Sequence, residues 1–193
     1  IADLSRALLE RPNDTLLLSE RRNRFVEIGN FEKAIIDQKQ LFELDTSNFY
    51  YRYELANLYF ELHTSNPNYI SNSLALIAEN SSAFPPMLLL RAKLYYVLQN
   101  YSEALKDINK YLPSYPFDAE AYFFKGLIYK DMGDLDLAKS QFQTAVEQDP
   151  NYVESYEQLA FIYSHNGDSL AKYYFKNALI ADSSLLSSWY NLA

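Results

Sequence analysis

The chain has 193 residues, of which 49 % are hydrophobic and 22 % are charged, and its net charge at pH 7 is −8. It contains no cysteine, which excludes disulfides, thiolate catalysis and cysteine-ligated zinc. The acidic excess is concentrated in residues 119–193, which carry ten acidic and five basic side chains. Nucleic acid is therefore not expected as a partner, because affinity for phosphate backbones comes largely from Lys and Arg. No transmembrane segment is expected in this stretch, since no apolar run approaches the roughly 18 residues that cross a bilayer.

Apolar residues recur at helical spacing along the whole chain, whereas the alternation typical of strands is absent. We therefore expect an all-α chain of helical hairpins with almost no sheet. The pattern divides the chain into a half-hairpin, five complete hairpins and the opening of a sixth. In chain order, these are residues 1–14, 15–48, 49–84, 85–118, 119–152, 153–185 and 186–193.

The hairpin of residues 119–152 shows the pattern in full. Each of its two helices carries three residues on one face, which are Tyr122, Gly126 and Tyr129, then Ala138, Phe142 and Ala145. Gly126 and Ala138 are small where the helices are expected to cross, so the two backbones can approach closely. Gly133 can take the left-handed conformation that ends a helix. Pro150 stops the second helix at the residue before it.

This order of an aromatic residue, a small residue and Tyr, followed by Ala, Phe, Ala and Pro within 34 positions, resembles the tetratricopeptide repeat. The resemblance extends over the whole chain, with a two-residue insertion in the loop of residues 63–68 and a one-residue deletion after Gly167. It implies an α-solenoid of stacked antiparallel helix pairs. It also implies a single domain over residues 1–193, with five full repeats and a half-repeat at each end.

No residue pattern in the chain indicates catalysis, a metal site or a cofactor. The two histidines, His63 and His165, lie far apart in the sequence, and no further ligands are expected to converge on either of them. The four glycines are expected at turns or at a helix crossing and not in a phosphate-binding loop. No serine has the setting of a hydrolase nucleophile. We therefore expect a binding protein and not an enzyme, with no catalytic residues, no metal and no cofactor.

The resemblance also implies where a partner would bind, because the concave groove of the family is lined by first-helix residues at positions 2, 5, 9, 12 and 13. From these positions the expected partner-binding groove comprises Asn23, Tyr53, Asn57, Leu89, Lys93, Tyr96, Phe123, Leu127 and Lys130. Phe161, Ser164 and His165 occupy positions 9, 12 and 13 of the last complete repeat. We expect a peptide, extended or helical, to be anchored by a few apolar contacts to groove side chains that lie outside the core. The alternative is that these residues only pack against neighbouring first helices.

Two binding modes of the family do not fit this chain. The carboxylate clamp for chaperone tails needs Lys, Asn and Arg at set positions in three successive repeats. Only Asn23 is present in the first window and only Asn57 in the next. The asparagine ladder of the O-linked sugar transferases needs Asn at position 6, where this chain has Asn191 alone.

The function that the sequence favours is a protein–protein interaction scaffold that binds a peptide segment or a partner domain in its groove or at its edge. One alternative is the targeting or assembly arm of a larger enzyme or secretion machine. Another is a bacterial envelope lipoprotein, because RFVEIGNFEKAIIDQKQLFELD is similar to tetratricopeptide lipoproteins of the Bacteroidota type. The expected location is accordingly the bacterial cell envelope or periplasm, with the cytoplasm as the alternative. A signal peptide or anchor before Ile1 is left open.

Two further expectations concern the basic run and the chain end. The run of residues 21–24, which contains three arginines, is interpreted as a solvated face with local ion pairs, because successive residues point around a helix axis. Residues 186–193 present Trp189 and Leu192 without a helix in the sequence to cover them. This segment is therefore expected to continue into further helices or to mediate end-to-end self-association.

Overall fold

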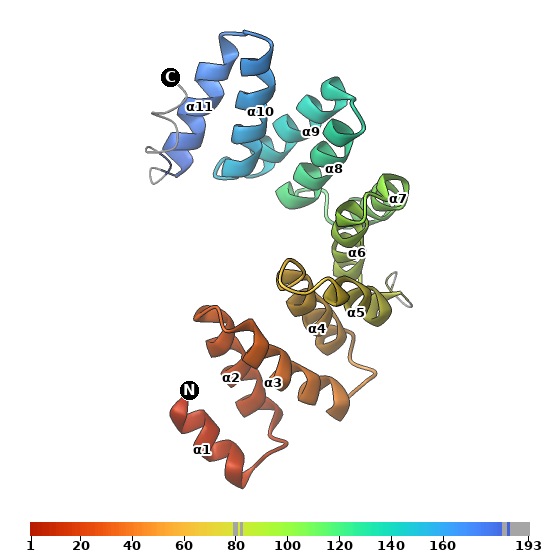
Figure 1. The fold of residues 1–193 in the computed structure, drawn as a ribbon, viewed down its shortest axis with the longest axis vertical. Helices are drawn as coiled ribbons and strands as arrows, with labels where there is room; N and C mark the ends of the chain where they lie inside the picture. Colours follow the sequence, from red (N-terminus) through yellow and green to blue (C-terminus); the bar gives the residue numbers. More distant parts are fainter. Residues whose placement is uncertain (79–80, 82, 183–184, 186–193) are drawn as a thin grey trace. The chain divides into compact units, whose positions relative to one another are not determined.

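The computed structural model of the protein describes residues 1–78, 81, 83–182 and 185 (Figure 1). These described residues form α-helices joined by loops, and none of them lies in a β-strand. In chain order the helices are α1 (Ala2–Glu10), α2 (Thr15–Glu27), α3 (Phe31–Leu44), α4 (Phe49–Glu61), α5 (Asn68–Ile77), α6 (Pro86–Val97), α7 (Tyr101–Tyr111), α8 (Ala119–Asp131), α9 (Leu135–Gln148), α10 (Val153–His165) and α11 (Leu170–Ala181). Residues 186–193, on which the expectation of self-association rests, lie outside the described residues.

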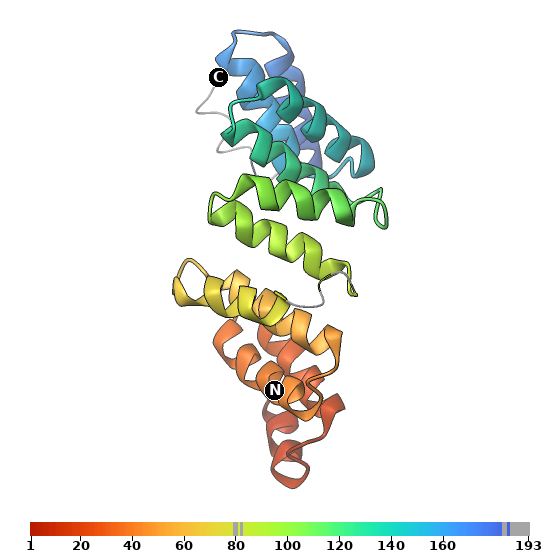
Figure 2. The same cartoon turned by 90° about the vertical axis from the view of Figure 1, so that its right-hand side faces the viewer.

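The fold is an α-solenoid of antiparallel helix pairs, as the sequence predicts. The pairs are α2 with α3, α4 with α5, α8 with α9 and α10 with α11 (Figures 1 and 2). The chain divides into two compact units, Ile1–Leu94 and Tyr95–Ala193, so that the boundary falls within α6. We call them the first and the second unit. The interpretation of residues 1–193 as a single domain stays a prediction.

Asp and Asn side chains determine where several helices begin. Asp14, Asn48 and Asp118 each accept two backbone N–H groups from the first turn of α2, α4 and α8, at 3.0–3.2 Å. Asn30 and Asp134 each accept one such N–H group from α3 and α9. A cap of this kind stabilises a helix by about 1 kcal/mol. The helix boundaries are therefore determined locally, by residues that recur at fixed places in the repeat.

The turns after α2, α8 and α10 each contain a glycine in the left-handed conformation. Gly29, Gly133 and Gly167 have φ angles of 70°, 87° and 66°. The N–H of each glycine, and that of the residue after it, donate to carbonyls at the end of the preceding helix at 2.8–3.0 Å. Gln99 takes the same place after α6, with a φ of 58° and the same two hydrogen bonds. A side chain in this conformation costs about 1–2 kcal/mol.

In the second unit, α8 and α9 cross where Gly126 meets Phe142. Both residues are buried, and a Cβ atom on Gly126 would lie 2.6 Å from Cε1 of Phe142. Phe142 packs with Leu159 and Ile162 of α10 in one hydrophobic cluster. The prediction of a small residue at this crossing is therefore confirmed.

In the first unit, Arg22 and Gln38 occupy the repeat positions of the glycine and the phenylalanine that cross in the second unit. Gln38 is fully buried, and its Nε2 donates to the carbonyl of Tyr51 at 2.8 Å. Arg22 is 7 % exposed, and its guanidinium donates to the carboxylate of Glu54 at 2.8 Å. This part of the first unit is therefore held by buried polar contacts where the second unit has an apolar one.

Arg21 connects three helices of the first unit. Its guanidinium donates to both carboxylate oxygens of Asp37 on α3, at 2.9 and 2.6 Å, and to Oγ of Ser5 on α1 at 3.2 Å. The interpretation of the arginine run as a solvated face is wrong for Arg21 and Arg22, because their partners lie on other helices. Arg24 is exposed and pairs with two acids of its own helix, as predicted.

Candidate partner-binding surface

The predicted groove residues of the first unit differ in how far their side chains are covered. Asn23 is exposed, whereas Tyr53, Asn57 and Lys93 are half-buried and Leu89 is buried. The ring of Tyr53 packs edge-on against Phe84, with centroids 5.6 Å apart, beside the hydrophobic cluster that joins α4, α5 and α6. The expectation that groove side chains lie outside the core is therefore wrong for Leu89, and Tyr53 takes part in packing.

In the second unit, Phe123 and Leu127 are also packing residues. The ring of Phe123 lies 5.8 Å from that of Phe142 and 5.3 Å from that of Tyr152, measured between centroids. Both Phe123 and Leu127 pack against the cluster that contains Phe142 and Leu159. Both side chains are partly buried against this core, and their place in a partner-binding groove stays a prediction.

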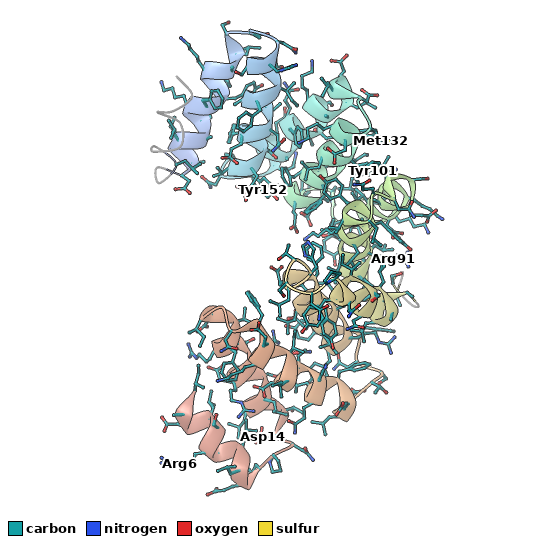
Figure 3. All side chains as sticks on the ribbon, viewed as in Figure 1. Arg6, Asp14, Arg91, Tyr101, Met132 and Tyr152 are labelled. Atoms are coloured by element: carbon teal, nitrogen blue, oxygen red, sulfur yellow. The ribbon has the colours of Figure 1, made fainter. Side chains whose placement is uncertain are left out.

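Tyr96 and Tyr101 lie near Asp131 at the C-terminal end of α8. Tyr96 packs edge-on against Phe124 at a centroid distance of 5.9 Å, and its hydroxyl donates to the carboxylate of Asp131. Burial, followed by Asp131, raises the pKa of Tyr96, and the same two causes raise the pKa of Tyr101. Figure 3 labels Tyr101 in this region. Both the ring and the hydroxyl of Tyr96 therefore contact residues of α8, which are Phe124 and Asp131.

The second unit has a hollow of about 580 Å³ toward the C-terminal ends of α8 and α10. Its lining consists of Lys130, Leu135, Gln158, Phe161, Ile162, Ser164 and His165. Phe161 is 47 % exposed, although its ring also meets that of Phe175 edge-on at 6.0 Å. Nζ of Lys130 donates to Oε1 of Gln158 at 2.8 Å and so joins α8 to α10 at the hollow. The hollow therefore combines an exposed aromatic ring with polar groups beside it.

The charges of α8 and α10 follow the direction of the helices. α8 has Glu120 in its first turn and Lys130 in its last, and α10 has Glu154 in its first turn and His165 in its last. The helix dipole favours acids at the N-terminal end and bases at the C-terminal end. Each helix therefore has an acid near its N-terminal end and a lysine or histidine near its C-terminal end, where the carboxylate of Asp131 on α8 lies by Tyr96 and Tyr101.

Tyr152, the residue before α10, marks the acidic end of these helices (Figure 3). Burial raises the pKa of Tyr152, and the neighbouring carboxylates that raise it further are Glu120, Glu154, Asp118 and Asp149. Burial, followed by Glu154, also raises the pKa of Glu157. We call the surface formed by Glu120, Lys130, Glu154, Glu157, Phe161 and His165 the graded face, because carboxylates lie toward the N-terminal ends of α8 and α10 and the Lys130 ammonium group lies toward the C-terminal end of α8.

The first unit has a second hollow, of about 490 Å³, between α3 and the loop that follows α1. Gln40, which lines it, donates to the carbonyl of Pro12 at 2.8 Å and to Oδ1 of Asn13 at 3.1 Å. These contacts join α3 to the loop, which indicates that the residues around this hollow hold the fold together.

Across the described residues, no helix is both long and apolar enough to span a membrane. In the same part of the chain, no group of three or more His, Asp or Glu side chains is placed to hold a metal ion.

Comparison with known proteins identifies the repeats. Two family models, both described as tetratricopeptide repeat, match residues 119–152 and 142–172. Residues 119–172 therefore belong to the tetratricopeptide-repeat family. A crystal structure of MamA is similar to it with a TM-score of 0.67 and 18 % sequence identity, over 86 % of this chain and 96 % of that one. TTC0263, a thermophilic TPR protein in Thermus thermophilus, has a TM-score of 0.68 and 22 % identity, over 81 % of this chain and 85 % of that one.

These structural similarities show that the fold is shared. Among curated proteins, Protein NPGR2 of Arabidopsis thaliana is 28 % identical over 105 residues, which amount to 52 % of this chain and 14 % of that protein. The chain therefore matches a small part of this relative's length. The repeats and the fold support a protein-interaction scaffold in general.

The hollow of the second unit combines residues that the sequence indicates and residues that it does not. Lys130 belongs to the predicted groove, and Phe161 and His165 occupy groove positions of the family. Leu135, Gln158 and Ile162 are missed, because Leu135 belongs to a second helix and the other two lie at positions 6 and 10. Only the contact of Gln158 with Lys130 on the neighbouring first helix places it at the hollow.

Proposed function

We propose that this protein is an interaction scaffold whose second unit binds a segment of a partner protein on the graded face. An apolar side chain of that segment inserts into the hollow beside Phe161. The observation that carries this proposal is the ring of Phe161, which stays 47 % exposed among polar neighbours in a hollow of about 580 Å³. Aromatic residues in such pockets supply a large share of the binding energy at protein interfaces.

The packing of the other predicted groove residues supports this choice of site. Phe123 and Leu127 are partly buried against the core of the second unit, so less of their surface is available to a partner than that of Phe161. Lys130 reaches the hollow and contributes a donor at its edge. The hydrophobic contact and the polar contacts of a bound segment are therefore available in one place, at α8 and α10.

A random peptide library tests the proposal. Short displayed peptides are selected on the immobilised protein, and each enriched peptide is measured against the wild type and Phe161→Ala by isothermal titration. We expect Phe161→Ala to weaken binding by roughly 10-fold or more, which corresponds to the loss of one anchor residue. Its melting temperature should stay close to that of the wild type, because about half of the ring is already in solvent.

Tyr173→Ala is the matched control, because Tyr173 is an aromatic residue with 59 % exposure on α11 that does not line the hollow. This control should bind the enriched peptides as tightly as the wild type. Phe123→Ala, in contrast, should lower the free energy of unfolding by about 2 kcal/mol, which is less than for a fully buried phenylalanine because Phe123 is partly buried against the core. Enriched peptides that bind Phe161→Ala as well as the wild type would show that the site lies elsewhere.

A further inference from the structure

We propose that the segment bound to the graded face carries a basic side chain on one side of its apolar anchor and an acidic side chain on the other. This inference rests on the proposed function, and it specifies the chemistry of the partner. It follows from the order of charges around the hollow.

The first step is the geometry of α10. Glu157, Phe161 and His165 follow one another at intervals of four residues, so they lie in a row on one face of the helix. A helix rises 1.5 Å per residue, which separates neighbouring members of this row by about 6 Å along the axis. The aromatic ring therefore has a carboxylate on one side and an imidazole on the other.

The acidic side of the ring extends beyond Glu157. Glu154 is exposed one turn earlier on α10, and Glu120 lies in the first turn of the neighbouring α8. Burial and the negative charge of Glu154 raise the pKa of Glu157, which shows that the carboxylates are close enough to repel each other. A Lys or Arg side chain of a ligand would relieve this repulsion.

The basic side of the ring is formed by the ammonium group of Lys130, which lines the hollow together with the imidazole of His165. Lys130 donates to Gln158, a neutral amide, so this contact does not cancel the positive charge. An Asp or Glu side chain of a ligand can pair with that ammonium group from the hollow. The helix dipole accounts for the sign of the charges at each end, but it does not account for the exposed ring between them.

The number of residues between the apolar anchor and each charged residue of the ligand depends on the conformation of the ligand. An extended segment advances about 3.3 Å per residue, so charges about two residues from the anchor would reach the two sides of the ring. A helical segment advances 1.5 Å per residue and needs about four residues. In both conformations the order is the same, with a base, an apolar residue and an acid.

Synthetic peptides with a central leucine provide the probes. One carries lysines on one side and glutamates on the other, and the comparison peptides carry lysines on both sides, glutamates on both sides or serines on both sides. Each is made with the charges two and four residues from the leucine. We expect the mixed-charge peptide to bind the wild type at least about 5-fold tighter than any other peptide, which is the effect of a few exposed ion pairs.

Charge-reversal variants test which residues form the acidic side and the basic side of the Phe161 ring. Glu157→Lys should transfer the preference to the peptide with glutamates on both sides, and Lys130→Glu should transfer it to the peptide with lysines on both sides. Glu147→Lys is the matched control, because it makes the same change in net charge at an exposed position of α9. It should leave the preference for the mixed peptide unchanged. If Glu157→Lys does not fold, Glu154→Lys makes the same test at an exposed position.

Each outcome separates this inference from the proposed function. Equal binding of the serine and the mixed peptides, lost in Phe161→Ala, would overturn the charge order and leave the proposed site standing. A preference that Glu147→Lys changes as much as Glu157→Lys does would also overturn the charge order, because it would reflect net charge alone. If no peptide binds in a manner that depends on Phe161, both the inference and the proposed function are wrong.

Discussion

Gln99 holds a backbone conformation that Gly29, Gly133 and Gly167 hold at the matching turns. We expect Gln99→Gly to raise the free energy of unfolding by about 0.5–1 kcal/mol. It removes the cost of a side chain at positive φ, which outweighs the larger backbone entropy that glycine loses on folding. Urea unfolding of the variant measures the gain. Gln99→Ala should show no such gain, because alanine keeps the Cβ atom, and equal stability of the two variants would contradict the explanation.

The raised pKa of Glu157 implies that the free energy of unfolding depends on pH. Burial and Glu154 raise its pKa in the folded protein above that of the unfolded chain. Between these two pKa values the folded protein binds more protons than the unfolded chain, so the contribution of Glu157 to stability falls as the pH rises through this window. Glu157→Gln should therefore melt at a higher temperature than the wild type at about pH 7, and the difference should shrink toward about pH 4. A constant difference across this range would exclude Glu157 as the cause.

At the scale of helix pairs, the crossing of α8 and α9 depends on the absence of a side chain at Gly126. A Cβ atom there would lie 2.6 Å from the ring of Phe142. We expect Gly126→Leu to lower the free energy of unfolding by about 1–3 kcal/mol through overpacking. Thermal and urea unfolding, followed by circular dichroism, measure the loss. An unchanged midpoint would mean that the ring can move aside without cost.

The helix pairs could be predicted from the sequence because their signals are local. Caps such as Asp118, turn glycines such as Gly133 and the crossing residue Gly126 act within one repeat, so their spacing is sufficient. The surface could not be predicted to the same degree, because the exposure of a side chain depends on the size of its neighbours in space. Phe123 is covered by Phe142 and Tyr152, whereas Phe161 at another groove position remains half exposed.

The buried polar contacts of the first unit also could not be predicted from the spacing of residues in the sequence. Arg22 stands at a position where the repeat pattern has a small residue, and its pairing with Glu54 joins two repeats. The sequence spacing places both residues on helices, but it does not show that the arginine turns inward. The interpretation as a solvated residue therefore failed for a physical reason, which is the presence of a carboxylate on the next first helix.

At the scale of the whole chain, we expect the effects of core substitutions to stay within the neighbouring helices. In a solenoid each repeat contacts only its neighbours, so destabilisation spreads over a short range. Asp37→Ala leaves Arg21 without its two carboxylate contacts and should destabilise the first unit by about 3 kcal/mol. Hydrogen exchange should accelerate in α1 to α4 and remain unchanged in α8 to α11.

The double variant Arg21→Met with Asp37→Leu is the control for that experiment. Replacing both members of a buried ion pair with apolar residues is often neutral or stabilising, so exchange in α1 to α4 should return close to the wild-type rate. Faster exchange of both units in Asp37→Ala would show that the chain unfolds as one cooperative body. The single-domain interpretation and the envelope location both stay predictions at this scale.

The common direction of charge along α8 and α10 determines how long a bound segment has to be. A segment aligned with this gradient lies parallel to the helices, and α10 has 13 residues, which corresponds to about 20 Å. Its length is then limited by the length of one helix and does not grow with the number of repeats. A short linear motif would be fully recognised by two neighbouring first helices, which leaves the remaining repeats available for a second partner.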